Sequence, residues 1–391
     1  MKNILIRNIK NKEFRSRNSR AERGRISDIF LSRECASPGG FLFDRKWSNF
    51  LSNKKRIWIT CALLMLPILI AHPGNAKAVK KVTRKQNITM KKLTPALEQK
   101  ISATTPAERP TSDLELIQPA TRLSTARLPQ GYTFDGTYYY YLSQLASFGS
   151  HQNDLRLTRV RYEGNGTYTE SYMTLKQFGH GTNLDCVTRN GVTWLWTGSD
   201  PSGSAGATTT ISCFTFQAGK TLRKHAAISY RIPIKGKKGR FGINCYPAIS
   251  PDGTQLAVRF TNNGGQQFQF YDLTDGTKIN PQTPKKTVRL KSTAGVFQGF
   301  DIFGTTVYTL EGTARKSEMK ELGKASAYDP IRIRSYNYTT KKSTVQTIKG
   351  AVALSHREPE GIQVDENGKA KIMIASHYKE KYTCVNVYGV K

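Results

Sequence analysis

The hydrophobic pattern of the chain changes at Leu128. From there to the carboxyl terminus, apolar residues occur in short alternating runs and almost never at helical spacing. The runs are rich in β-branched and aromatic residues, as in LRLTRVRY, VTWLWTG, TTTISCFTF, QLAVRF and IRIRSYNY. Runs of this length and composition are typical of β-strands. Residues 128–391 are therefore predicted to form an all-β domain.

Turn signals divide this domain into five similar units. Turn glycines stand between apolar runs at Asp135-Gly136, Asn190-Gly191, Asp252-Gly253, Phe303-Gly304 and Asn367-Gly368, with spacings of 55, 62, 51 and 64 residues. Dipeptides of this kind are the usual signal of a tight β-hairpin. A second motif precedes three of the turns, at Gln130-Gly131-Tyr132, Gln298-Gly299-Phe300 and Glu360-Gly361-Ile362.

Each unit of about 58 residues holds enough strand for one four-stranded antiparallel sheet, and radially repeated sheets of that kind make a β-propeller. We therefore predict a five-bladed β-propeller whose first and last blades meet by ring closure. The structural alternative is a β-sandwich with hairpin insertions. That alternative does not predict five evenly spaced hairpins with a common lead-in.

The amino-terminal segment, residues 1–78, has the features of an export signal. An apolar run from Ile57 to Ala71 follows Lys54-Lys55-Arg56 and precedes the small-x-small pattern Ala76-Lys77-Ala78. A membrane-spanning helix needs about 20 apolar residues, whereas this run is shorter and contains Pro67. We expect a cleaved signal peptide after a long n-region, with a retained anchor as the alternative. The start codon is then expected to lie downstream of Met1.

Residues 79–127 are basic at first and then rich in Ser, Thr, Pro and Ala. This composition buries little apolar surface, so we expect a flexible basic linker that ends where the propeller begins. The whole chain has 60 Lys and Arg against 28 Asp and Glu, a net charge of +32. Such a charge favours polyanionic partners: nucleic acid, anionic lipid or a phosphate-rich wall polymer. Export makes nucleic acid the poorest of the three, and the membrane is expected to be met only through the signal segment.

The chain has 38% hydrophobic residues, which excludes a wholly disordered protein. Its six cysteines show no CxxC spacing, so neither a zinc site nor a redox pair is predicted, and the pairing of the later four stays open. We find no G-x-S-x-G elbow, H-E-x-x-H, P-loop or calcium-loop motif. The sequence thus names no catalytic residue and requires no cofactor.

Polar residues ahead of the turns are the candidates for a ligand site. The innermost strand of each blade lines the channel, so we expect these residues to converge on one channel mouth. They are Gln130, His180, Thr182, Asn183, Cys245, Tyr246, Gln298, Asp301, Glu358 and Glu360. The alternative is that amides such as Asn183 and Gln298 hold neighbouring backbone. His180 with Glu358 and Glu360 is also suited to bind a channel cation or to act as acid and base.

Two basic clusters are candidates for polyanion binding. The first lies in a glycine-rich link and consists of Lys235, Lys237, Lys238 and Arg240. The second consists of Lys285, Lys286, Arg289 and Lys291. Both are also explained by solvated charged loops, but a cationic exported protein near phosphate polymers favours an electrostatic attachment role.

Four stretches of the domain resemble the helveticin J family of class III bacteriocins. They are FGHGTNLDCVTRNGVTWLWTGSDPS, CYPAISPDGTQLAVRF, FQGFDIFGTTVYTLEG and EPEGIQVDENGKAKIMIASHYK, and the resemblance runs from Tyr132 to Val390. The motifs that carry it are Gly179-His180, Gln298 to Asp301, and Glu358 with Glu360, in that order. The chain is also similar to a wider group of propeller domains, shared with a teichoic-acid-biosynthesis protein and a staphylococcal phage receptor-binding protein.

This resemblance implies a five-bladed propeller that kills, or binds the wall of, related Gram-positive bacteria. The chain departs from the family at Cys245-Tyr246, where relatives carry a histidine or an acidic residue, and in its long basic extension. Three functions follow as hypotheses: a secreted bacteriocin that binds an anionic wall glycopolymer, a non-lethal adhesion or receptor-binding propeller, and a wall-polymer hydrolase that uses His180, Glu358 and Glu360.

Overall fold

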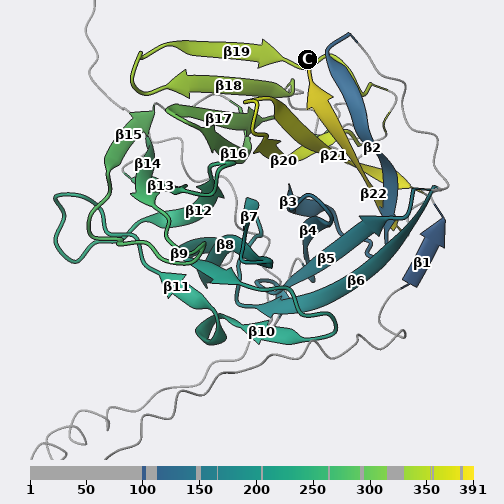
Figure 1. The fold of residues 1–391 in the computed structure, drawn as a ribbon, viewed down its shortest axis with the longest axis horizontal. Helices are drawn as coiled ribbons and strands as arrows, with labels where there is room; N and C mark the ends of the chain where they lie inside the picture. The colour runs from purple at the N-terminus through teal and green to yellow at the C-terminus, as the bar shows by residue number, and fades with distance from the viewer. Residues whose placement is uncertain are drawn as a thin grey trace, which may run out of the picture. The chain divides into compact units, whose positions relative to one another are not determined.

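The computed structural model describes residues 99–102, 112–146, 151–164, 166–203, 206–262, 265–290, 295–314, 330–352, 354, 356–378 and 382–391. The predicted signal segment lies outside these residues. The described strands form five sheets around a central channel, and the innermost strands β3, β7, β12, β16 and β20 face that channel (Figure 1). The predicted five-bladed all-β propeller is confirmed. No helix of the described residues is long and apolar enough to cross a membrane.

Each blade has four antiparallel strands, which run outward from the channel. Blade 1 comprises β3 (Pro129–Phe134), β4 (Tyr139–Gln144), β5 (Leu155–Tyr162) and β6 (Thr167–Lys176). Blade 2 comprises β7 (Leu184–Arg189), β8 (Val192–Ser202), β9 (Ala207–Phe214) and β11 (Ile228–Tyr230). Blade 3 comprises β12 (Ile243–Ile249), β13 (Gln255–Asn262), β14 (Gly265–Asp272) and β15 (Lys286–Leu290).

Blade 4 comprises β16 (Phe297–Phe303), β17 (Thr306–Glu311), β18 (Arg332–Asn337) and β19 (Ser343–Thr347). Blade 5 comprises β20 (Glu358–Val364), β21 (Ala370–Tyr378), β22 (Tyr382–Val390) and β2 (Leu114–Leu123). Two further strands extend blade 1 beyond four: β1 (Gln99–Ser102) pairs antiparallel with β6, and β10 (Thr221–Arg223) pairs parallel with it. A short 3-10 turn, η3 (Lys224–Ala226), follows β10.

The fifth blade closes the ring with a strand from the other end of the chain. β2 pairs antiparallel with β22 from Leu114↔Val390 to Leu123↔Thr383, with two register shifts on the way. The expected linker, residues 79–127, is therefore wrong over this stretch, because the propeller includes residues before Leu128. Local composition did not indicate this strand, because its backbone partners lie at the far end of the sequence. An edge strand can also contain a proline, as β2 does in the sequence LELIQPATRL.

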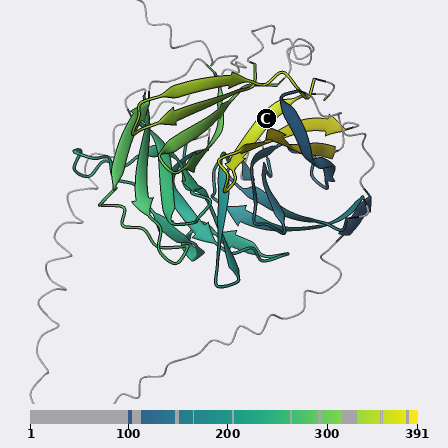
Figure 2. The same cartoon turned by 45° about the horizontal axis from the view of Figure 1, so that its top comes forward.

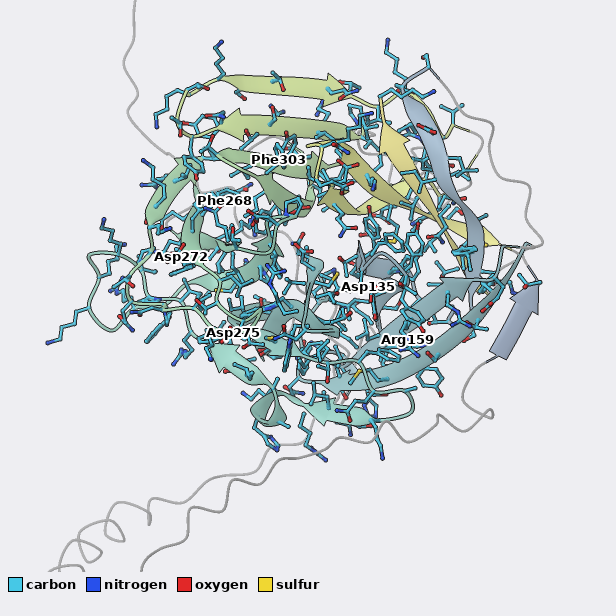
Figure 3. The ribbon with its side chains drawn as sticks, viewed as in Figure 1. Asp135, Arg159, Phe268, Asp272, Asp275 and Phe303 are labelled. Atoms are coloured by element: carbon cyan, nitrogen blue, oxygen red, sulfur yellow. The ribbon has the colours of Figure 1, made fainter. Side chains whose placement is uncertain are left out.

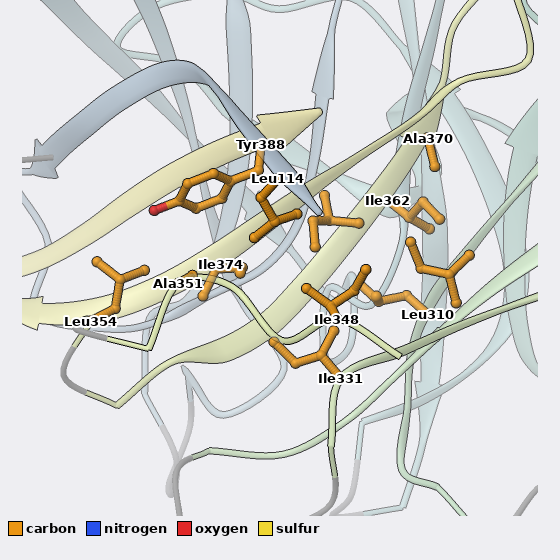
Figure 4. Close-up of a cluster of buried hydrophobic side chains, with 12 residues drawn as sticks. Leu114, Leu310, Ile331, Ile348, Ala351, Leu354, Ile362, Ala370, Ile374 and Tyr388 are labelled. Carbon is orange, nitrogen blue, oxygen red and sulfur yellow. The ribbon is translucent and has the colours of Figure 1, made fainter. Parts of the chain in front are cut away.

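Hydrophobic side chains fill the space between neighbouring blades. Five buried clusters correspond to the five blade interfaces, and each draws its residues mainly from two adjacent sheets. Figure 4 shows the cluster between blades 4 and 5, where Leu114 of β2 lies close to Tyr388 of β22. The sheets remain distinct when the ring is tilted (Figure 2).

The five predicted turns join the first and second strands of the five blades. Two of them leave only two residues between paired positions, and one of these is Asn190-Gly191, which connects the paired residues Arg189 and Val192. Both turn residues have positive φ, 53° and 73°, the conformation that favours Asn-Gly in two-residue hairpins. The turn signals in the sequence therefore located every inner hairpin.

Candidate functional site

The candidate residues divide between the two ends of the channel. Each inner strand begins at its lead-in motif and ends at its hairpin turn, and a strand of six or seven residues spans about 20 Å. We call the two ends the lead-in mouth and the hairpin mouth. The candidates were expected to converge on one mouth, and the direction of the inner strands places their lead-in positions at the mouth opposite the turns. Asp301 alone among them lies deep, beside the hairpin cavity.

At the lead-in mouth, residues from blades 1, 2 and 5 interact. The Gln130 amide donates a hydrogen bond to Glu360 Oε1 at 3.1 Å, which joins blades 1 and 5. The Glu358 carboxylate lies 2.7 Å from His356 Nε2. His180 Nδ1 lies 2.9 Å from the Gln144 amide. The sequence missed His356 and Gln144 as partners, although His356 is adjacent to the Glu-Pro-Glu motif.

Burial controls the charge of this mouth. Burial raises the pKa of Glu360 well above its ordinary value, and the neighbouring Glu358 raises it further. Burial lowers the pKa of His180, and the opposing effect of Glu358 is the smaller one. His180 is therefore neutral, and Glu360 keeps its proton to a higher pH than an ordinary glutamic acid. Both side chains are suited to hydrogen bonding with hydroxyl groups. Within the described residues, no three His, Cys, Asp or Glu side chains are grouped as ligands for a metal ion.

Two of the predicted ligand residues bind neighbouring backbone instead. Asn183 donates to the Pro247 carbonyl at 2.6 Å and accepts the Phe300 amide at 2.9 Å, so it links three blades. The Gln298 amide donates to the Gly312 carbonyl at 2.9 Å. Thr182 is hydrogen-bonded to Tyr246, which is buried. Asn183 and Gln298 thus make the contacts of the alternative interpretation, in which these amides bind neighbouring backbone.

The lead-in glycines let the inner strands approach one another. A Cβ on Gly131 would lie 2.8 Å from the Gly181 carbonyl oxygen, and one on Gly361 would lie 2.8 Å from Tyr132 Cδ1. Such contacts are too short for any larger residue without movement of the backbone or the ring. The Gln-Gly-aromatic motif therefore has a packing role as well as a position at the mouth.

Asp301 and Asp185 connect blades in the same way. Asp185 Oδ2 accepts the Ile249 amide of blade 3 at 2.6 Å, and Asp301 Oδ2 accepts the Val364 amide of blade 5 at 2.5 Å. Gln363 repeats the pattern between blades 5 and 1 by accepting the Phe134 amide. Burial raises the pKa of Asp185 to about 7, and burial together with the Asp185 charge raises the pKa of Asp301 well above its ordinary value.

The hairpin mouth contains a cavity of about 500 Å³. Figure 3 labels Asp135 beside the open centre of the ring. The charged residues that line the cavity are Asp135, Asp185, Asp301, Asp365, Glu366, Arg189 and Lys371. A second cavity of about 510 Å³ between blades 3 and 4 shares Ser250, Pro251 and Glu366 with it and is also lined by Phe303. Sequence reasoning noted Asp135 only as a turn residue, although acids recur near three of the five turns.

The first basic cluster surrounds a hollow on blade 3. The bridge Pro233↔Phe241 closes a loop that carries Lys235, Lys237 and Lys238, and these lysines line a hollow of about 630 Å³ with residues 281–284 and Gln269. No acidic residue lines it. Arg240 belongs to the same loop but is not part of the lining.

The second basic cluster is less uniform. Lys285 forms an ion pair with Asp272 at 2.5 Å, which offsets its charge. Lys286 and Arg289 lie exposed on the outer strand β15, and Lys291 lies outside the described residues. Of the two clusters, the first therefore provides the stronger positive surface.

Known proteins share this architecture. The tail fiber of Staphylococcus aureus phage P68 is similar in structure, with a TM-score of 0.53 and 16% identity over 71% of this chain and 52% of that one. The putative major teichoic acid biosynthesis protein C of Bacillus subtilis (strain 168) is 26% identical over 263 residues, 65% of this chain and 57% of that protein. The chain thus spans little more than half the length of either relative. Residues 128–377 match the family described as phage 5-bladed beta propeller receptor binding platform domain, so the chain belongs to that family.

Proposed function

We propose that the protein is exported and binds an anionic glycopolymer at the surface of Gram-positive bacteria. The observation that carries this proposal is the hollow on blade 3, with three lysines and no carboxylate in its lining. Every repeating phosphate of a phosphate-bearing polymer is attracted electrostatically to such a surface. Membership of a receptor-binding propeller family and similarity to a protein named for teichoic acid biosynthesis support the same class of partner.

The test is attachment of the fluorescently labelled, purified protein to Gram-positive cells that have or lack wall teichoic acid. The variant K235Q/K237Q/K238Q removes the cationic lining of the hollow. We expect roughly tenfold weaker attachment, since each exposed ionic contact contributes about 0.2–1 kcal/mol. The matched control K342Q/K349Q/K369Q removes the same charge from exposed positions elsewhere and should attach almost normally. Equal losses of attachment in both variants, or equal attachment to cells with and without teichoic acid, would contradict the proposal.

Killing is the second candidate function, favoured by the resemblance to the helveticin J family. In this proposal the attached propeller lowers the viability of related Gram-positive cells. Viable counts taken from the same attachment samples separate a bacteriocin from a non-lethal adhesion module. Attachment with unchanged counts would support the adhesion module.

Hydrolysis of the wall polymer is the third candidate. Glu358 shifts the pKa values of both His180 and Glu360, so its carboxylate lies within electrostatic range of each of them. Release of soluble fragments from purified walls, lost in H180A/E358A/E360A, would support an enzyme. Walls that release nothing would remove this candidate.

A further inference from the structure

Arg259 is buried against aromatic rings of two blades. It stands on β13 directly opposite Tyr246 of β12, and its side chain is 7% exposed. The guanidinium carbon is 4.0 Å from the centre of the Phe297 ring and 5.6 Å from that of the Tyr246 ring. The two rings are nearly parallel, with centres 6.2 Å apart. Rings from blades 3 and 4 therefore both contact the cation, and Phe297 is the closer of the two.

The charge of Arg259 has no oxygen partner in the described part of the chain. Its Nε is fully buried and makes no hydrogen bond. The groups that act on its charge are Tyr246 and Cys245, which are neutral at pH 7, and burial lowers its pKa to about 10. Other buried or half-buried arginines do have oxygen partners: Arg156 with Glu170 at 2.7 Å, Arg334 with Glu311 at 2.9 Å and Arg357 with the Gly350 carbonyl at 2.7 Å. A buried cation without such a partner is costly.

The two rings that contact Arg259 belong to the lead-in segments of their blades. Tyr246 is hydrogen-bonded to Thr182 of the lead-in to blade 2, and Phe297 directly precedes Gln298. Of the three nitrogens of Arg259, only Nε is buried without a hydrogen-bond partner, so we take the terminal amino groups as the donors for a ligand. Stacking on a ring occupies the face of a guanidinium and leaves its in-plane N–H groups available.

We infer that Arg259, held by Tyr246 and Phe297, is a binding subsite for a phosphate-type oxyanion at the lead-in mouth. Planar guanidinium groups bind phosphate oxygens through paired, charge-assisted hydrogen bonds. A bound oxyanion would supply the charge and the acceptors that the protein does not. The inference rests on the proposed function only for the source of this phosphate, which is then a repeating unit of the wall polymer.

Inorganic phosphate is the probe for the first experiment, which measures thermal unfolding at constant ionic strength. The unfolding temperature of the unaltered protein should rise with phosphate and reach saturation. R259M should bind phosphate about tenfold more weakly or worse, as expected for the loss of one charged hydrogen bond. Without phosphate, R259M should unfold at the same temperature or higher, because it removes an uncompensated buried charge.

R231M is the matched control. It removes the same charge and a similar ring contact, since Arg231 lies 4.3 Å from the Phe241 ring, but Arg231 is exposed. R231M should keep the full phosphate response. R259K keeps the charge without the planar fork and should show a reduced response even if R259M folds poorly. A normal response in R259K and R259M, or an equal loss in R231M, would overturn the inference.

Attachment to cells separates this inference from the proposed function. If the protein binds no wall polymer but R259M still loses the phosphate response, the subsite stands and the proposed function fails. If the protein attaches through teichoic acid and the phosphate response is the same in R259M, the subsite fails alone. Acetate in place of phosphate should produce no saturable shift, and an equal response to acetate would contradict the assignment to phosphate.

Discussion

Replacing Leu123 or Leu114 with alanine should destabilise the whole ring, although both residues lie before the predicted start of the domain. Leu123 is 0% exposed and packs between blades 5 and 1, whereas Leu114 is 1% exposed and packs between blades 4 and 5. Truncation of a buried leucine costs about 2–5 kcal/mol. The two residues contact separate clusters, so the losses should be nearly additive. The double variant would lose roughly 4–10 kcal/mol, a large part of the stability of a typical domain.

Urea unfolding followed by tryptophan fluorescence measures this loss. Trp196 is buried in blade 2, away from the closure, so it reports whether loss of the closing strand is transmitted around the ring. L145A serves as the control, because Leu145 follows β4 and is 39% exposed. Each single variant should unfold at clearly lower urea than L145A. Midpoints equal to that of L145A would refute the reasoning that β2 is an integral strand of blade 5.

Three further predictions concern the interior. The pKa of Asp185 is raised to about 7 from 3.8 by burial, so its contribution to stability is present at low pH and is lost as pH rises from about 4 to 7; D185N should flatten the fall in urea midpoint over that range, and an unchanged slope would contradict this. G131A should destabilise by about 1–3 kcal/mol because of the Gly181 carbonyl, whereas G265A, whose Cβ would meet only the movable end of the Arg289 side chain, should cost less in the same unfolding assay. The free thiols of Cys213 and Cys245, whose pKa values burial raises, should react with a thiol reagent only as urea unfolds the protein, and rapid labelling of either thiol in the folded protein would contradict their burial.

Signals between residues close in sequence were sufficient to predict the fold class and the blade number. Asn190-Gly191 specifies its own hairpin through positive φ, and the other four turns work through similarly local chemistry. β2 could not be recognised in this way. Its partner strand, β22, is more than 250 residues away, and its polar Gln118 and Thr121 are buried through contacts that the folded ring creates, such as the hydrogen bond from Tyr141 of blade 1 to Gln118.

The site was predicted less well because its contacts cross from blade to blade. The sequence indicated polar groups near the channel, but the direction of the inner strands separates them from the turns. Asn183 looked like a ligand and instead binds the backbone of blades 3 and 4. Arg259 was missed within the run QLAVRF, where a single charge among apolar residues was a signal in itself.

The distribution of charge limits where a polyanion can bind. At physiological ionic strength, charges more than about 8 Å apart in solvent are largely screened, so local groups matter more than the net +32. The hairpin cavity is lined by five acidic and two basic residues, which disfavours phosphate there. The hollow on blade 3 and Arg259 both present positive charge without a lining carboxylate, and both involve blade 3. A phosphate polymer should therefore bind along blade 3, while the hairpin cavity suits an uncharged or cationic group such as a sugar hydroxyl or an amine.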